Sequence, residues 1–155
     1  MNYLTPEQVL FIHYRIIEGT GGSHGIRDVT LLQSALARPM ATFDKNDLYP
    51  DIFSKTAALM HSIIKNHPFV DGNKRTAVTT ASLFLLKNGY YLRTSNKELE
   101  RFTLKVAAKD IELQEIAKWF KRNSFLIILL YHQCLQEADL QKIVQTYCER
   151  LDFQQ

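Results

Sequence analysis

The sequence predicts an all-α protein, and two observations support this fold class. Apolar residues recur every three or four positions along most of the chain, which is the period of an amphipathic helix. Residues that cap helices precede these stretches, and glycine or proline follows them. The chain has 155 residues, 46% hydrophobic and 23% charged, with no internal repeat, so we expect a globular protein that can bury a core.

The first helix is expected to begin after Thr5. Thr5 and Gln8 have the spacing of a capping box, and Pro6 occupies the first helical position, where proline is well tolerated. Gly19 is expected to end the helix. The apolar stripe of this helix consists of Val9, Leu10, Ile12, Ile16 and Ile17.

The second and third helices lie on either side of an ambiguous segment. The second helix carries Leu31, Leu32, Ala35 and Leu36 and ends at Pro39. Residues 40–50 are compatible with a loop or a short hairpin. A third helix is expected over residues 51–65, with an apolar face of Ile52, Phe53, Ala57, Met60 and Ile64. Pro68 disfavours the helical region for the residue before it, so we expect His67 on a loop.

Three further helices complete the predicted domain. The fourth is expected over residues 72–88 and ends at Gly89. Ser95 or Asn96 caps the fifth, which ends near residue 109. Asp110 is expected to cap the sixth, which ends near residue 123. We therefore expect one helical domain over residues 1–122 and a C-terminal helical extension over residues 123–155.

The composition excludes several classes of protein. A net charge of +3 is too small to indicate nucleic-acid binding, and no DNA-binding motif is present. Cys134 and Cys148 cannot form a disulfide framework or a four-ligand zinc site by themselves. The longest apolar run, residues 125–130, is far shorter than the roughly 20 residues that span a bilayer. We expect a cytoplasmic protein without membrane segments.

The segment "NHPFVDGNKRTA", residues 66–77, concentrates chemically active side chains around one helix start. Backbone N–H groups at a helix N-terminus attract phosphate, and Gly72 leaves their approach open. Lys74 and Arg75 add cations where a purely structural helix favours carboxylates. Asp71 offers an oxygen ligand for Mg²⁺, and His67 can accept a proton near neutral pH. Together they indicate transfer from a Mg²⁺-nucleotide to a hydroxyl.

Simpler interpretations of the same residues exist. Asp71 and Arg75 have the i,i+4 spacing of a surface ion pair, and His67 alone is an ordinary loop residue. A metallohydrolase site of His61, His67 and Asp71 is disfavoured because Pro68 breaks the helix that would align them.

The segment "HPFVDGNKR" resembles the signature of the Fic/Doc superfamily, and its "NKR" ending resembles the Doc (death-on-curing) branch. The similarity continues in "YLTPEQVLFIHYRIIE", "GGSHGIRD", "LLQSALARP", "DLYPDIFSKTAAL" and "LFLLKNGY", in the same order. It covers roughly residues 3–120. The resemblance implies a Fic-type helical bundle with the motif loop between two central helices.

The resemblance also separates two reactions. Fic-type AMP transferases have glycine at the position of Lys74 and commonly a second arginine at the position of Val78. The Doc branch is implied to be a kinase-like toxin that transfers the γ-phosphate of ATP to a threonine of translation elongation factor Tu and so stops translation. Gly72 stands where some Doc members carry alanine, which keeps AMP transfer to a protein hydroxyl open as an alternative.

The roles of the family carry over to matching positions. His67 is expected to be the general base, with Lys74 and Arg75 also in the catalytic set, and Asp71 the Mg²⁺ ligand. The residues expected to hold ATP are Phe69, Gly72, Asn73, Lys74 and Arg75. Phe69 is also expected to anchor the loop in the core. Four residues, Arg15, Glu18, Arg27 and Lys65, are further candidates for contact with nucleotide or target.

The resemblance implies restraint by a partner. The self-inhibitory pattern of some Fic proteins is absent, because Thr94 and Glu98 are followed by Leu99 rather than glycine or asparagine. A Phd-like antitoxin is therefore expected to fold its tail into a groove on this chain. A non-catalytic binding module that acts through such a partner is the alternative of another class. The extension, residues 123–155, is expected to pack on the domain or to form a dimer or antitoxin surface.

Overall fold

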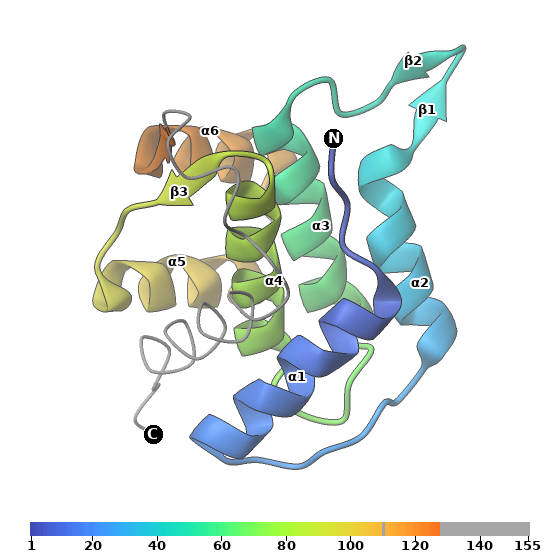
Figure 1. Cartoon of the computed structure of the whole chain (residues 1–155), viewed down its shortest axis with the longest axis vertical. Coiled ribbons are helices and arrows are strands. Elements are labelled where there is room, and N and C mark those ends of the chain that lie inside the picture. Colours follow the sequence, from blue (N-terminus) through green and yellow to red (C-terminus); the bar gives the residue numbers. More distant parts are fainter. Residues whose placement is uncertain (110, 128–155) are drawn as a thin grey trace.

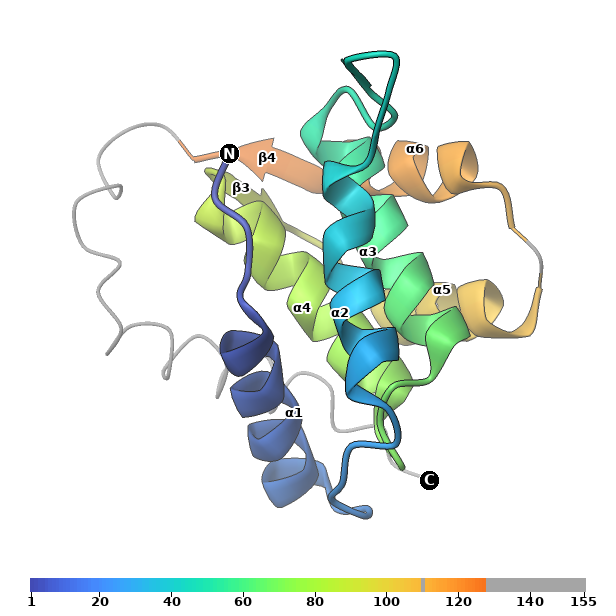
Figure 2. The same cartoon turned by 90° about the vertical axis from the view of Figure 1, so that its right-hand side faces the viewer.

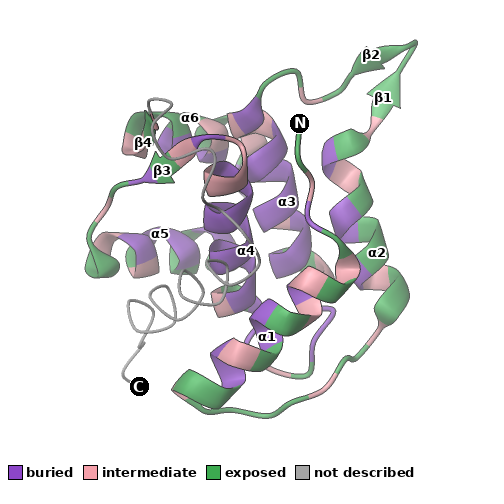
Figure 3. Ribbon diagram, in the orientation of Figure 1, coloured by how far each residue is buried: buried purple, intermediate pink, exposed green. Residues whose placement is uncertain are grey.

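The computed structural model describes residues 1–109 and 111–127, and these residues form a helical bundle (Figure 1). Helices α3 (Ile52–Asn66) and α4 (Asn73–Lys87) pack against each other at its centre. Helix α3 also contacts α2 and α6. Most side chains of α3 and α4 are buried, as the purple ribbon in Figure 3 shows. The predicted all-α class is confirmed, since only short strands accompany the helices.

Helix α1 (Pro6–Thr20) begins as predicted, because Thr5 and Gln8 form the complete capping box. The predicted stop at Gly19 is wrong by two residues. Gly21 adopts a φ of 77° and its N–H donates to the carbonyl of Ile17 at 2.9 Å. A glycine inside a helix costs only about 1 kcal/mol, whereas the turn out of the helix requires a positive φ that glycine adopts freely.

Helix α2 (Val29–Ala37) is capped by Asp28 and continues into a short 3₁₀ turn, η1 (Arg38–Met40), that contains Pro39. The ambiguous segment that follows is a hairpin of β1 (Thr42–Phe43) and β2 (Asn46–Asp47). Its two central residues both have positive φ, as a tight hairpin turn requires.

The hairpin is held by a buried lysine on α3. The Nζ of Lys55 donates to Asp47 Oδ2 at 2.8 Å and to the carbonyl of Pro39 at 2.9 Å. The hairpin and the loop that follows α3 lie at opposite ends of that helix (Figure 2). The hairpin therefore does not contribute to the motif loop.

Helices α5 (Asn96–Ala108) and α6 (Leu113–Asn123) follow the central pair. Ser95 caps α5, in agreement with the sequence. The predicted start of α6 at Asp110 is wrong, because its first residue is Leu113 and its N-cap is Glu112. Asp110 itself lies outside the described residues. The sequence signal failed because a residue type that suits a cap does not by itself fix where a helix begins.

One sheet was missed by the sequence analysis. Strand β3 (Tyr90–Leu92) pairs antiparallel with β4 (Ser124–Leu126), and Tyr91 lies opposite Phe125. The predicted helical extension is therefore wrong for residues 124–126, which form a strand of the bundle. The rest of the extension, and every prediction for residues 128–155, lies outside the described part of the chain. Among the described helices, none combines the length and the apolar character needed to cross a membrane.

Candidate active site

The motif loop joins the two central helices, as predicted. His67 ends α3 in the left-handed conformation, with a φ of 48° and a ψ of 56°. Few residues other than glycine adopt this conformation. Pro68 disfavours the right-handed helical region for the residue before it, so α3 does not continue through His67. The His67 side chain is exposed. His67 is thus outside the helix and open to solvent, as a base for an incoming hydroxyl requires.

Phe69 anchors this loop in the core. Its side chain is 1% exposed and stacks on the His13 ring with centroids 3.9 Å apart. Its backbone is held by Asn73, because the Phe69 N–H donates to Asn73 Oδ1 and Asn73 Nδ2 donates to the Phe69 carbonyl, each at 2.9 Å. The predicted anchoring role is confirmed.

The geometry bears on two of the expected nucleotide-binding residues. Phe69 points into the core and does not border the cavity described below, and its contact with ATP stays a prediction. Asn73 borders that cavity, but its amide oxygen and one amide hydrogen bind the backbone of Phe69. The Asn73 side chain therefore positions the loop, and only one of its two amide hydrogens is left to bind a phosphate.

His13 on α1 was not among the predicted site residues. Its Nε2 lies 3.0 Å from the carbonyl oxygen of Asp71, to which it donates. Burial lowers the pKa of His13, so the ring is held neutral against Phe69. The sequence does contain a signal for this residue. His13 adjoins Ile12 and Ile16 on the apolar side of the first helix, and a histidine buried there needs a hydrogen-bond partner.

Asp71 presents an ionised carboxylate. Its Oδ1 accepts from the Gly72 N–H at 2.6 Å and its Oδ2 accepts from the Ser23 N–H at 3.2 Å. The Gly72 N–H, followed by the Ser23 N–H and the charge of Arg75, lowers the pKa of Asp71. The side chain remains 46% exposed. A hard, charged and accessible oxygen beside an anion-binding helix start fits a Mg²⁺ ion shared with phosphates.

The described residues offer no other metal site. No group of three or more histidine, cysteine, aspartate or glutamate side chains converges anywhere in residues 1–109 or 111–127. His61 lies on α3 with its Nδ1 3.2 Å from Nη1 of Arg38. The alternative of a metallohydrolase therefore has no ligand cluster in this part of the chain.

Arg75 has a structural role that the sequence did not reveal. Its Nη1 donates to Thr20 Oγ1 and, at 3.0 Å, to the carbonyl of Gly21. These contacts place the cation at the C-terminus of α1, where the helix dipole favours it. Its Nη2 lies 3.8 Å from Asp71 Oδ1, and the side chain is 17% exposed. The guanidinium thus joins α1 to the motif, and one edge still borders the cavity.

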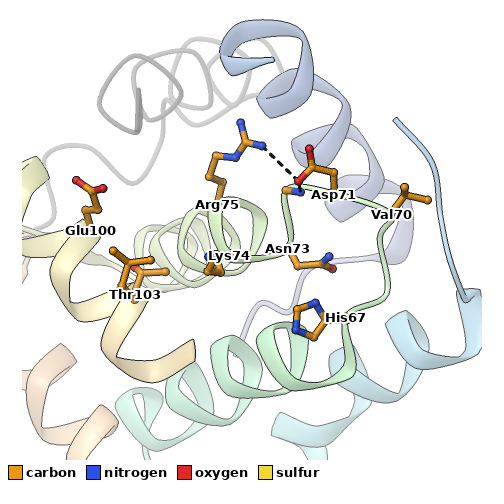
Figure 4. Close-up of a pocket in the computed structure, with 10 residues that line it drawn as sticks. His67, Val70, Asp71, Asn73, Lys74, Arg75, Glu100 and Thr103 are labelled. Carbon is orange, nitrogen blue, oxygen red and sulfur yellow. Dashed lines mark hydrogen bonds and ion pairs between the residues drawn. The ribbon is translucent and has the colours of Figure 1, made fainter. Parts of the chain in front are cut away.

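The first turn of α4 is open to an anion. Gly72, the N-cap, has a φ of 73° and no side chain caps the turn, so its backbone N–H groups have no side-chain partner. A cavity of about 590 Å³ lies in front of it and is shown in Figure 4. The motif contributes His67, Val70, Asp71, Gly72, Asn73, Lys74 and Arg75 to its lining. The sequence analysis missed the opposite wall, formed on α5 by Glu100, Thr103 and Leu104.

The loop between α1 and α2 runs along the motif loop. Val70 N–H donates to the Gly25 carbonyl at 3.0 Å, and Arg27 N–H donates to the Pro68 carbonyl at 2.7 Å. The Arg27 guanidinium binds the carbonyl of Asn66 at 2.7 Å, so Arg27 holds the end of α3. This backbone pairing connects segments that are about 45 residues apart and could not be read from local sequence patterns.

Two other candidates, Glu18 and Lys65, have partners within the protein. Glu18 pairs with His24 at 2.9 Å, and Lys65 Nζ lies 3.4 Å from the carbonyl of Lys109. Neither borders the cavity. Arg15 is not among the cavity residues either.

One loop of the helical bundle carries an exposed histidine, an ionised aspartate and an uncapped helix start, which are features expected of a Fic-type site. The model of the Fic/DOC family matches residues 3–85, more than half of the chain, so the protein belongs to the Fic/DOC family. Two relatives support the Doc branch. The chain is 43% identical over 99 residues to "Toxin Doc" of Mycolicibacterium smegmatis, which covers 63% of this chain and 76% of the relative. It is 30% identical over 122 residues to "Protein kinase doc" of Escherichia phage P1, which covers 79% and 95%.

Proposed function

We propose that this chain is the toxin of a toxin–antitoxin pair and a protein kinase that transfers the γ-phosphate of ATP to a hydroxyl of another protein. One observation carries the proposal. His67, Asp71, Lys74 and the uncapped start of α4 all border the same cavity of about 590 Å³. The names of the two relatives, a toxin and a protein kinase, point in the same direction.

Each residue has a distinct part in the proposed reaction. The N–H groups of the first turn of α4 and the charges of Lys74 and Arg75 bind the phosphates of ATP. Asp71 would hold Mg²⁺ together with those phosphates, and a bound ion would supply positive charge to offset the charge that develops during transfer. His67 takes the proton of the target hydroxyl while the oxygen of that hydroxyl forms a bond to the γ-phosphorus. The bond from that phosphorus to the bridging oxygen breaks, and ADP leaves.

Lys74 favours phosphate transfer over AMP transfer. It is exposed at the mouth of the cavity, at the position where the AMP-transferring members of the family are expected to have glycine. Val78, at the position of their second arginine, is fully buried in α4 and brings no charge to the cavity. The lysine adds bulk and charge beside the helix start, which supports an ATP bound with its γ-phosphate toward His67.

The proposed target is a threonine of translation elongation factor Tu, in the cytoplasm, whose phosphorylation stops translation. The proposed regulator is a Phd-like antitoxin that folds on the toxin. Both proposals rest on membership of the Doc branch. ATP and Mg²⁺ are the cofactors that the reaction requires.

The proposal is tested with purified protein, elongation factor Tu and ATP that is labelled either at the γ- or at the α-phosphate. We expect label from the γ-phosphate only, and only when Mg²⁺ is present. Label from the α-phosphate would identify the alternative, AMP transfer. The binding-module alternative predicts no transfer with either label, together with growth arrest by a His67→Ala, Asp71→Ala double variant.

A further inference from the structure

The loop after α1 makes backbone hydrogen bonds to two charged side chains of the motif. A carbonyl group faces Arg75, and an N–H group faces Asp71. The carbonyl of Gly21 accepts from Arg75 at 3.0 Å, whereas the N–H of Ser23 donates to Asp71 Oδ2 at 3.2 Å. Arg75 and Asp71 remain 3.8 Å apart, longer than a direct hydrogen bond. The backbone of the loop thus holds the aspartate and the arginine side by side without joining them tightly.

Gly22 makes this arrangement sterically feasible. A Cβ atom at this position would overlap with Oδ2 of Asp71 and would lie 3.2 Å from Nη2 of Arg75. The φ of Gly22 is +117°, which residues with a side chain rarely adopt. The close approach of the main chain to the carboxylate of Asp71 therefore requires glycine at position 22.

The neighbouring glycine provides a contrast. Gly21 also has a positive φ, +77°, but a Cβ atom there would meet nothing within 4 Å. The Gly21 carbonyl that accepts from Arg75 belongs to the main chain, so a substitution by alanine does not remove it. Alanine at position 21 therefore imposes backbone strain without entering the space of the carboxylate.

We propose that Gly22 and the Ser23 N–H form a positioning element. This element fixes the carboxylate of Asp71 where it can bind a metal ion together with the nucleotide. This inference rests on the proposed function. The loop N–H holds Oδ2 at a defined place, and the missing side chain of Gly22 leaves that place free. Neither residue touches the reacting atoms, so both act through Asp71.

Titration with a non-hydrolysable ATP analogue tests the element, in Mg²⁺ and again in excess EDTA. With Mg²⁺ we expect Gly22→Ala to weaken affinity by about tenfold or more, and with EDTA by less than about threefold, because only the metal-dependent part uses the carboxylate. Gly21→Ala, which also adds backbone strain, is the matched control: any weakening that it causes should be equal in Mg²⁺ and in EDTA. In an Asp71→Ala background, Gly22→Ala should have no further effect on the metal-dependent part.

A second measurement does not depend on nucleotide. The amide hydrogen exchange of Ser23, followed by NMR in the full chain, should accelerate in Asp71→Ala and in Gly22→Ala but not in Gly21→Ala, because only the first two remove or displace the acceptor. Equal exchange in the wild type and Asp71→Ala would overturn the positioning role even if Gly22→Ala fails to fold. Equal weakening by Gly22→Ala with and without metal would overturn it too.

The proposed function and the positioning element are contradicted by different results. A wild-type chain that binds no nucleotide in either condition contradicts the proposed function and, with it, the metal-directed role of the element. A wild-type chain that binds nucleotide in a Mg²⁺-dependent manner, with Gly22→Ala equal to Gly21→Ala, contradicts the positioning element alone.

Discussion

Replacing Asn73 by alanine tests whether this residue serves the loop or the ligand. Asn73 is 7% exposed, and its side chain makes two hydrogen bonds of 2.9 Å to the backbone of Phe69. Truncation leaves a buried N–H and a buried carbonyl without these partners. Because Phe69 itself is 1% exposed, water cannot easily replace them.

The expected size of the effect follows from these two groups. A buried polar group that loses its partner costs about 1–3 kcal/mol, so two of them give a loss of about 2–4 kcal/mol once partial relaxation of the loop is included. Urea unfolding followed by circular dichroism measures this difference as a lower midpoint at an unchanged m-value. Lys74→Ala is the matched control, because Lys74 is the adjacent, exposed residue on the same turn. It should change the free energy of unfolding by less than about 0.5 kcal/mol.

A small effect would refute this reasoning. If Asn73→Ala destabilised the chain no more than Lys74→Ala, the Phe69 contacts would not matter for stability. Asn73 would then be free to act mainly on phosphate, as the sequence alone suggested. If it destabilised the chain as expected, reduced activity of the variant would reflect a displaced loop.

Three other predictions address the chemistry and its supports. His67→Ala should lower transfer by about two to four orders of magnitude in single-turnover assays, with an unchanged urea midpoint because the side chain is exposed. Lys74→Met should lower γ-phosphate transfer by about one to two orders of magnitude, which initial rates at saturating target protein measure; an unchanged rate would remove Lys74 from the catalytic set. Burial lowers the pKa of His13, so the unfolded chain binds more protons, and stability should fall as the pH drops below about 6.5. Urea unfolding at several pH values should show this decline, and His13→Gln should flatten it; an equal decline in both proteins would contradict the assignment.

Local patterns in the sequence predicted the bundle well because its helices obey local rules. Thr5 with Gln8, Ser95, and the proline after His67 each act within a few residues of their own position. The corrected boundaries have the same origin. Gly19 and Asp110 are residue types that suit a helix stop and a helix cap, but residue type alone does not fix the exact position at which a helix ends or begins.

The parts that were missed depend on contacts between distant segments. His13 binds the carbonyl of Asp71, which lies 58 positions further along the chain. Strand β3 pairs with β4, although α5 and α6 separate the two strands in the sequence. The wall of the cavity on α5 is likewise set by how that helix packs beside α4. Periodicity reports which face of an element is apolar but not which element covers it.

The sequence predicted several residues that border the cavity but only partly how they are held in place. The motif places His67, Asp71 and Lys74 at one cavity, as expected. The roles of Asn73 and Arg75 could not be separated from ligand binding by sequence, because an amide or a guanidinium that binds a backbone looks the same in a motif as one that binds a phosphate.

The central proposal is phosphate transfer to a protein hydroxyl, and the intact mass of elongation factor Tu after incubation with the chain and Mg²⁺-ATP tests it most directly. We predict a gain of one phosphoryl group, located on a threonine by fragmentation, and no gain with His67→Ala. A gain of one adenylyl group, or an unmodified elongation factor under conditions in which the chain still arrests growth, would contradict the account.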